Sequence, residues 1–405
     1  MISVKEAKDR ILALARPVGT EQVGLSEALG RVLATDVAAR VSHPPAAVSA
    51  MDGYAVKAAD VASAPVTLRV IGQSAAGHPF PGTMSSGETV RIFTGAVLPE
   101  GADAVVMQED TESGGTTVRM TAEAARTTPG RYVRPRGLDF NTGEVLLKAG
   151  RVLSFRDIGL AAAMNVPWLR VARRPRIAVL STGDEVVYPG DPLAPGQIPG
   201  ANGLALSAFI AAAGCVPLDL GIALDDRDSL RTLAAGAAGA DMLVSSGGVS
   251  VGDHDLIQEV LGEIGLKVDF WRVAVRPGKP LVFGTFGQVP LLGLPGNPVS
   301  AMVGAVLFLS PFLRVLQGLP AHSGPNPTAL LGRDLPANDS REDYLRAILS
   351  RDEKGQLIVH PFELQDSAMM ARLADADCLA IRPPLAPPAP AGTPIEIIPL
   401  TSASF

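Results

Sequence analysis

Three apolar runs in the middle of the chain each end in a glycine-rich turn, and this pattern limits the possible folds more than any other feature of the sequence. The turns are residues 180–185 (LSTGDE), 245–255 (SSGGVSVGDHD) and 293–300 (GLPGNPVS). Each run is continuous enough to be a strand buried on both faces of a sheet. Helices are predicted over residues 202–214, 229–239 and 254–264. Asn202 is the predicted cap of the first of these helices, and Gly214 is its predicted end. Strand alternating with helix predicts a parallel α/β sheet.

The ends of these strands are candidate anion sites, because ligands of open parallel sheets bind beyond the carboxyl ends of the strands. Glycine lets backbone N–H groups approach an anion, and a following helix N-terminus adds partial positive charge. Ordinary turns favour the same residues, so the hypothesis depends on three turns sharing one edge. No turn matches a nucleoside-triphosphate loop or a dinucleotide fingerprint. The candidate phosphate-binding residues are Ser181, Thr182, Gly183, Ser246, Gly247, Gly248, Ser250, Pro295, Gly296, Asn297 and Pro298.

Acidic residues gather in the same turns. They are Asp184, Glu185, Asp253 and Asp255, with Asp225 and Asp226 after another strand. A carboxylate beside an anion is unfavourable unless a cation lies between them, and Mg²⁺ fills that role with one or two carboxylates, phosphate oxygens and water. For each acid singly the alternative is a helix cap or a solvated loop, and this alternative is the better interpretation of Asp225. His254 has no second histidine at ligand spacing, which argues against a transition-metal site.

Two cations stand on the turn RPGKP, residues 276–280. Arg276 and Lys279 lie near another predicted strand end, where they could hold a phosphate or another oxyanion. The alternative is two surface charges on a turn.

The remaining sequence divides around this α/β segment, which we place at 176–320. Ser3 and Glu6 have capping-box spacing, a short helix is predicted to start at Ser26, and Ser154 is a predicted cap. These helical pieces form a discontinuous linking domain, 1–40 and 146–175. Residues 41–145 are a β-rich insertion, and residues 326–405 are a small C-terminal β-sheet or barrel.

The net charge, the cysteines and the N-terminal sequence argue against several classes of protein. The net charge of -6 argues against general nucleic-acid binding. Cys215 and Cys378 form no metal motif and are interpreted as buried thiols. Because the N-terminus lacks an apolar signal core and Val299–Leu316 reads as a buried helix, we expect a soluble, cytoplasmic protein without a membrane span.

Six motifs in order carry a family resemblance: MDGYAV, IFTGA, LSTGDE, SGGVSVGDHD, RPGKP and LPGNPVS. Together they resemble the molybdopterin molybdenumtransferase family, MoeA and the gephyrin E-domain, over nearly the whole chain. The resemblance implies an elongated four-domain homodimer with a MogA-like α/β domain, and a cleft between that domain of one subunit and the insertion of the other. It implies a reaction of adenylated molybdopterin with molybdate that yields molybdenum cofactor and AMP and requires Mg²⁺. The expected partners are the molybdopterin adenylyltransferase and molybdoenzyme targets.

Individual residues carry over by motif. The resemblance turns Asp52 and Thr94, which alone would be turn residues, into site residues, and adds Asp139 of the RGLD segment. The implied catalytic residues are Asp52, Asp139, Glu185, Asp255 and Lys279. Glu185 and Asp255 are the implied metal ligands, and Thr94 and Arg276 join the substrate-binding residues.

Two departures from the family pattern keep alternatives open. Ala47, Val48 and Ser49 replace a common Asp-Asn-Ser stretch, and GQIPGAN, with Pro199, replaces GQIYDSN. Both remove polar groups near the expected cleft. A non-catalytic paralogue that carries or senses the cofactor is therefore the second hypothesis, and a scaffold protein is the third.

Overall fold

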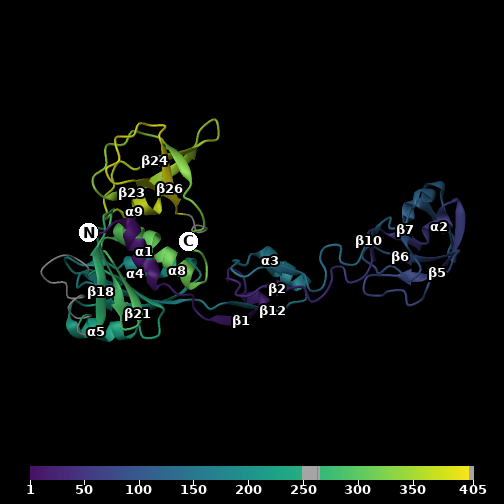
Figure 1. Cartoon of the computed structure of the whole chain (residues 1–405), viewed down its shortest axis with the longest axis horizontal. Helices are drawn as coiled ribbons and strands as arrows, with labels where there is room; N and C mark the ends of the chain where they lie inside the picture. The colour runs from purple at the N-terminus through teal and green to yellow at the C-terminus, as the bar shows by residue number, and fades with distance from the viewer. Residues whose placement is uncertain (249–261, 263–264, 401–405) are drawn as a thin grey trace. The chain divides into compact units, whose positions relative to one another are not determined.

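The computed structural model describes residues 1–248, 262 and 265–400 (Figure 1). The chain forms two compact units: one joins Met1–Glu21 to Ala172–Phe405, and the other is Gln22–Val171. The connections between the units are the paired strands β1 (Thr20–Gly24) and β12 (Trp168–Ala172). The predicted boundaries between domains remain predictions.

A six-stranded sheet is the centre of the first unit, in the order β16-β13-β17-β21-β20-β18. The strands are β13 (Arg176–Thr182), β16 (Val216–Ala223), β17 (Met242–Ser246), β18 (Leu266–Arg272), β20 (Pro280–Phe286) and β21 (Val289–Leu294). The first four in the sheet order are parallel, which confirms the predicted parallel α/β core. Strand β20 runs antiparallel to both of its neighbours, β21 and β18, and this antiparallel end of the sheet was not predicted.

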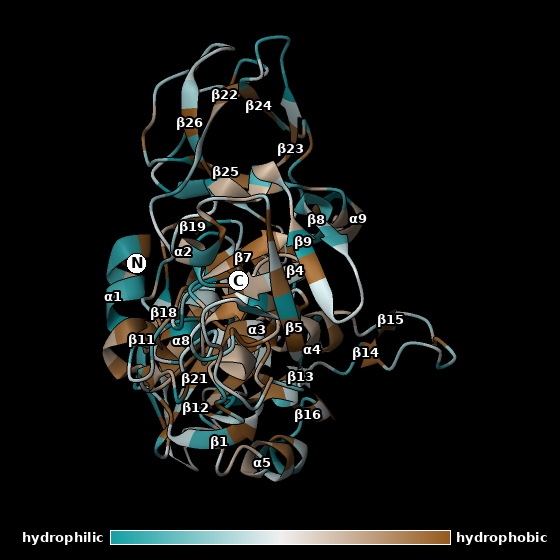
Figure 2. Cartoon of the chain, turned by 90° about the vertical axis from the view of Figure 1, so that its right-hand side faces the viewer, coloured by the Kyte–Doolittle hydropathy of each residue, from teal (hydrophilic) through white to brown (hydrophobic). Residues whose placement is uncertain are grey.

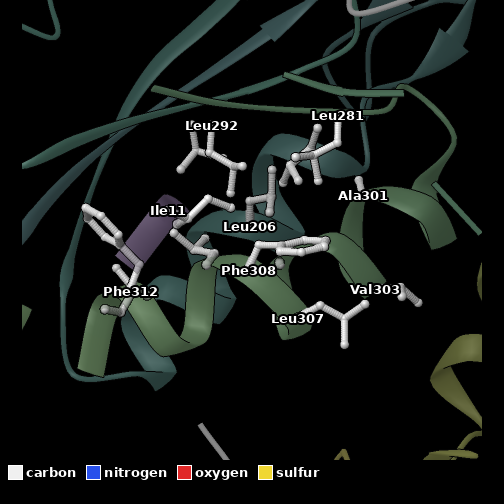
Figure 3. Close-up of a cluster of buried hydrophobic side chains, with 14 of the residues drawn as sticks. Ile11, Leu206, Leu281, Leu292, Ala301, Val303, Leu307, Phe308 and Phe312 are labelled. Atoms are coloured by element: carbon white, nitrogen blue, oxygen red, sulfur yellow. The ribbon is translucent and has the colours of Figure 1, made fainter. Parts of the chain in front are cut away.

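Helices cover both faces of this sheet. Four of them share a core cluster with one face: α1 (Val4–Leu14), α4 (Asn202–Ala212), α7 (Pro298–Gly304) and α8 (Ser310–Leu316). The opposite face packs against α5 (Arg227–Ala235). Figure 3 shows Ile11, Leu206, Leu292 and Phe308 meeting inside the first cluster. Two-sided burial explains why the strands lack polar alternation.

The apolar stretch Pro298–Leu316 is long enough to cross a membrane, yet 78% of it is buried inside the protein. It runs as α7, a π-helical turn (η4, Ala305–Leu309) and α8. Its side chains Phe308 and Phe312 are in the core cluster. This confirms the prediction of a buried helix.

The C-terminal strands close into a five-stranded barrel, which confirms that part of the predicted fold. The ring is β23 (Glu342–Arg351), β24 (Leu357–Pro361), β22 (Thr328–Leu331), β26 (Pro394–Pro399) and β25 (Cys378–Arg382), closed by the β23–β25 pairing. A short strand, β19 (Val275–Arg276), adds to β23 from the α/β side. A helix, α9 (Met370–Ala374), precedes β25.

The second unit contains another six-stranded sheet, in the order β7-β4-β6-β5-β9-β8. Its strands are β4 (Gly53–Val56), β5 (Val66–Ser74), β6 (Glu88–Ile92), β7 (Ala104–Met107), β8 (Thr111–Ser113) and β9 (Thr117–Met120). Two small apolar clusters pack against it, one of them with the short helix α2 (Ala58–Val61). A third cluster joins α3 (Phe155–Ala163) to the pair β2 (Val37–Ala38) and β11 (Val145–Leu147).

Several local predictions can be compared with these elements. Ser3 accepts a hydrogen bond from the Glu6 N–H, and a capping box at Ser154 starts α3, both as predicted. The helix predicted at Ser26 is wrong: Leu25–Glu27 form a single 3₁₀ turn. The helix predicted at 229–239 starts earlier because Asp226 caps it. Nearly all of the helix predicted at 254–264 lies outside the described residues.

Candidate functional site

The glycine-rich turns of the α/β unit meet at one edge of its sheet. The strand register places Ser181 beside Ser246, and Ser246 beside Leu294. The Gly247 N–H donates to the Leu294 carbonyl at 3.2 Å. A Cβ added at Gly296 would lie 3.7 Å from Gly247 Cα. The ends of β13 and β17, as far as Gly248, and the turn after β21 therefore form one contiguous surface of backbone groups.

Glycine is required at Gly247 by conformation and by space. Its φ is 92°, in the left-handed region, and an added Cβ would lie 2.6 Å from the Thr182 carbonyl oxygen. Because that neighbour is backbone, it cannot move aside without displacing the strand end. The buried Thr182 hydroxyl has no hydrogen-bond partner within the described part of the chain.

Asn202 connects two of these turns, a role that the sequence did not indicate. We predicted Asn202 as the cap of a helix, and this is wrong: Ala201 is the cap residue, without a side-chain bond. The Asn202 side-chain amide instead donates to Ser246 Oγ and to the Gly296 carbonyl, each at 2.8 Å. Both N–H donors of the amide are thus used between strands, while its oxygen, the atom that would accept from the helix N-terminus, makes no capping bond.

The acids of the first turn form a cluster with a residue from the next strand. The Asp184 carboxylate accepts a hydrogen bond from the Asp225 N–H at 2.9 Å. Burial, and then the charges of Asp184 and Glu185, raise the pKa of Asp225. Asp225 is an exposed loop residue, which agrees with the solvated-loop part of its preferred interpretation, and the neighbouring Asp226 is the residue that caps α5.

No group of three potential ligands is close enough to hold a metal ion within residues 1–248 and 265–400. The second predicted ligand, Asp255, lies outside the described residues, as does Ser250. Gly248 is described and exposed. The concentrated negative charge around Asp225 is favourable for a cation, and Mg²⁺ needs only one or two carboxylates when phosphate supplies the rest. Glu185 therefore fits such a site.

The two cations of the RPGKP turn have different surroundings. Strand β20 is antiparallel to β21, so the turn before β20 lies at the same edge as the glycine turns. Arg276 faces the C-terminal barrel, where its Nη2 donates to Asp343 at 2.5 Å and to Asn338 at 3.1 Å. Lys279 is exposed and forms no ion pair within the described residues. Lys279 is therefore the cation available to a ligand.

The turn after β21 is also contacted by the C-terminal region. The Asn297 side-chain amide donates to Ser367 Oγ at 2.9 Å, and the Val299 N–H donates to the Ser367 carbonyl at 3.1 Å. Pro295 faces the RPGKP turn, because a Cβ at Gly278 would lie 3.8 Å from its Cγ. Pro298 is the first residue of α7, where a missing N–H costs nothing.

In the second unit the structure brings Asp52 and Thr94 together. The Thr94 N–H and hydroxyl both donate to one Asp52 carboxylate oxygen at 2.7 Å. These bonds, with the nearby Arg91 guanidinium, lower the pKa of Asp52. The cation of Arg91 also lies 5.0 Å from the Tyr54 ring. Asp52 is therefore an exposed carboxylate whose position is fixed by its hydrogen bonds to Thr94.

Asp139 is less constrained. Its side chain is exposed, and its N–H donates to the His43 carbonyl at 3.0 Å. No contact places it beside Asp52 within the described residues.

Both cysteines are buried, as predicted, and both are free. Burial raises the pKa of each thiol to about 12. They are therefore protonated at neutral pH and unsuited to metal binding.

Family profiles match three successive parts of the chain. They are described as the MoeA N-terminal region (domain I and II), at residues 2–165, the "Probable molybdopterin binding domain", at 178–315, and the MoeA C-terminal region (domain IV), at 328–400. The sheet edge described above lies in the second of these.

Relatives match over most of their length. A molybdopterin molybdenumtransferase of Nostoc sp. is 39% identical, covering 85% of this chain and 81% of the relative. One from Haemophilus influenzae is 34% identical, with 94% of each covered. A solved molybdopterin biosynthesis MoeA protein from Pyrococcus horikosii superimposes with a TM-score of 0.85 at 32% identity, with 98% of each chain covered.

Proposed function

We infer the activity from one premise: the chain belongs to the MoeA family and is a transferase of molybdenum cofactor biosynthesis, a molybdopterin molybdenumtransferase. We propose that its substrates are adenylated molybdopterin and molybdate, and that it releases finished cofactor and AMP. The observation that supports this most is the convergence of three glycine turns and Lys279 at one edge of the sheet.

The proposed reaction needs no oxidant or reductant. The two dithiolene sulfurs bind Mo(VI) as one oxygen of molybdate leaves as water, which takes up the two thiol protons, so the metal keeps its oxidation state. A water molecule cleaves the phosphoanhydride, so AMP departs. Since the sulfurs belong to the substrate, the enzyme has no need of a thiolate, in accord with two buried, protonated cysteines.

The backbone N–H groups of the glycine turns would bind phosphate oxygens, because they are directed donors that remain in place during the reaction. Lys279 would place an oxyanion such as molybdate beside the dithiolene, as an exposed point charge on the neighbouring turn. Asp52, Thr94 and Asp139 would act from the β-rich insertion, where Asp52 is kept ionised by its bonds to Thr94.

We further propose that the reaction depends on Mg²⁺, held by Glu185 and Asp255 together with phosphate oxygens. The ion would supply charge neutralisation at the phosphoanhydride. The negative charge around Asp225 supports this proposal from the described side of the site.

The setting of the reaction is also a proposal. A homodimer would let the α/β domain of one subunit meet the insertion of the other. We place the enzyme in the cytoplasm, receiving substrate from a molybdopterin adenylyltransferase and passing cofactor to molybdoenzymes, without nucleic acid or membrane.

The test is an assay of the purified chain with adenylated molybdopterin, molybdate and Mg²⁺. AMP release together with cofactor formation supports the proposal. Glu185→Ala and Asp255→Ala are expected to abolish both while folding and oligomeric state persist. A folded Asp255→Ala enzyme with full activity would refute the metal site. Tight binding of adenylated molybdopterin without AMP release would instead identify a non-catalytic carrier.

A further inference from the structure

The turn that follows β21 is held on two sides by side chains from distant parts of the chain. On one side Asn202, from the first residue of α4, donates to the Gly296 carbonyl and to Ser246 Oγ. On the other side is Ser367, in the loop after β24: its hydroxyl accepts from the Asn297 side-chain amide, and its backbone carbonyl accepts from the Val299 N–H. The turn is thereby fixed between the α/β domain and the C-terminal region.

None of these side chains serves the local helix ends. Asn202 lies at the start of α4 and Asn297 is the cap residue of α7, yet neither makes a side-chain capping bond. Asn residues at such positions usually accept a bond from the first turn. Here their amides act as donors to groups 44 to 94 residues away in sequence.

The Asn202 bonds also set the distance between two neighbouring turns. Ser246 is the last residue of β17, and its hydroxyl, 2.8 Å from the Asn202 amide, lies 3.4 Å from the Pro295 carbonyl. The amide therefore links the end of β17 to the turn after β21. Backbone donors bind an anion well only when their positions are fixed to within about 0.5 Å.

We propose that Asn202 and Ser367 are positioning residues, which hold the end of β17 (residues 246–248) and the turn after β21 in the spacing that binds the phosphate groups of the substrate. This inference rests on the proposed function of the same site. The two residues act through the turns and make no contact with substrate themselves. Because the turns bind phosphate in the ground state and the transition state alike, their displacement changes KM more than kcat.

The test compares Asn202→Asp, Asn202→Ala and Ser367→Ala with the wild type. Loss of the Asn202 bonds is expected to raise the KM for adenylated molybdopterin about tenfold, with kcat changed less than about threefold. Ser367→Ala is expected to raise KM in the same direction. A merely structural defect would lower the fraction of active enzyme, and hence kcat, without raising KM.

Asn202→Asp supplies a readout specific to the donor role. At about pH 8 the new carboxylate cannot donate and repels the Gly296 carbonyl, whereas at about pH 5 a partly protonated acid can donate one bond. The KM of Asn202→Asp is therefore expected to recover toward the wild-type value on acidification, whereas that of Asn202→Ala is not. Ser207→Ala is the matched control, because this hydroxyl of α4 is buried and has no hydrogen-bond partner among the described residues.

The dissociation constant of adenylated molybdopterin, measured by titration of the same variants, separates two failures. If the wild-type chain binds adenylated molybdopterin but releases no AMP, the proposed reaction is overturned. The dissociation constants of the wild type and the Asn202 variants still test the positioning role in that case. Asn202→Asp and Asn202→Ala with wild-type KM and dissociation constant at both pH values would overturn the positioning role.

Discussion

Arg276 and Lys279 stand three residues apart on one turn, and the structure predicts opposite consequences for their removal. The Arg276 guanidinium pairs with Asp343, whose side chain is only 10% exposed, while Arg276 itself is 42% exposed. Loss of one partner of a fully buried pair costs about 3–5 kcal/mol, because the other charge stays buried. The exposure of Arg276 lets water screen part of that charge, so we expect about 2 kcal/mol for Arg276→Ala.

Lys279→Ala is the matched variant. Its side chain is exposed and forms no ion pair within the described residues. The free energy of unfolding should therefore change by less than about 0.5 kcal/mol, whereas AMP release should be lost. Arg276→Lys should recover part of the stability, because a lysine keeps the charge but cannot reproduce the two-partner contact.

Urea unfolding of the three variants, followed by circular dichroism, measures the stability difference, and the AMP-release assay measures activity. Equal stability of Arg276→Ala and wild type would refute the bridging role of Arg276. Retained activity of a folded Lys279→Ala enzyme would refute the assignment of Lys279 to the oxyanion.

The remaining predictions follow from single sites. Gly247→Ala should raise the KM for adenylated molybdopterin and lower stability by about 1–3 kcal/mol, because the left-handed φ of 92° is costly for alanine and its Cβ meets the Thr182 carbonyl; a wild-type KM would contradict this. Asp225→Asn should stabilise the metal-free protein, measured by thermal unfolding, at neutral pH but not near pH 4. Because the pKa of Asp225 is raised in the folded state, ionisation of this carboxyl lowers the free energy of unfolding. The loss is absent below the pKa of the unfolded chain and grows as the pH rises. An equal stabilisation by Asp225→Asn at both pH values would refute this reasoning. Phe308→Ala, in the core of Figure 3, should cost about 3–5 kcal/mol of unfolding free energy in urea titrations, and a loss under 1 kcal/mol would show that the helix is less tightly packed. Val48→Asn should lower stability by about 1 kcal/mol without raising kcat/KM, because the amide would be buried in a β-bridge to Val97; a rise in kcat/KM would show that the family asparagine is needed for turnover.

The strand ends could be predicted from the sequence because their determinants are local. Continuous apolar runs and glycine turns specify β13, β17 and β21 without knowledge of the partner strands. Strand β18 lacked such a pattern, since Leu266–Arg272 is mostly exposed and carries charged residues. Strand β18 can therefore be identified only in the structure, from its antiparallel hydrogen bonding to β20.

Side-chain partners were less predictable than the turns that carry them. Asn202 has the residue type and position of a helix cap, and only the sheet topology reveals Ser246 as its partner. Arg276 has the charge expected of an oxyanion ligand, but its partner Asp343 lies 67 residues away in the barrel. In both cases the local sequence indicated a polar residue at the edge of the sheet but did not identify its hydrogen-bond partner. The partner is selected by the tertiary fold, which brings distant residues within reach of the side chain.

A two-stranded ribbon that extends from the sheet carries Pro199, one of the two departures from the family pattern that left a non-catalytic carrier as the second hypothesis. It pairs β14 (Val186–Val187) with β15 (Ile198–Pro199), and Figure 2 shows it reaching away from the strands. The Ile198 N–H donates to the Glu185 carbonyl at 2.8 Å, and the Gly200 N–H donates to the Val187 carbonyl at 2.8 Å. Pro199 lies between these two donors, so its missing N–H removes no bond of the ladder.

The backbone of Glu185 is thus held by a neighbour of Pro199, whatever side chain stands at that position. Val48, the other departure, is buried beside Val97, so it packs within the second unit and leaves the Asp52–Thr94 contact in place. Both changes fall at positions where the backbone supplies the connection, and the charged groups of the motifs around them are retained. The chain keeps Glu185 and Lys279, the charged groups on which the proposed reaction depends, and this favours a catalytic transferase over a paralogue that only carries the cofactor.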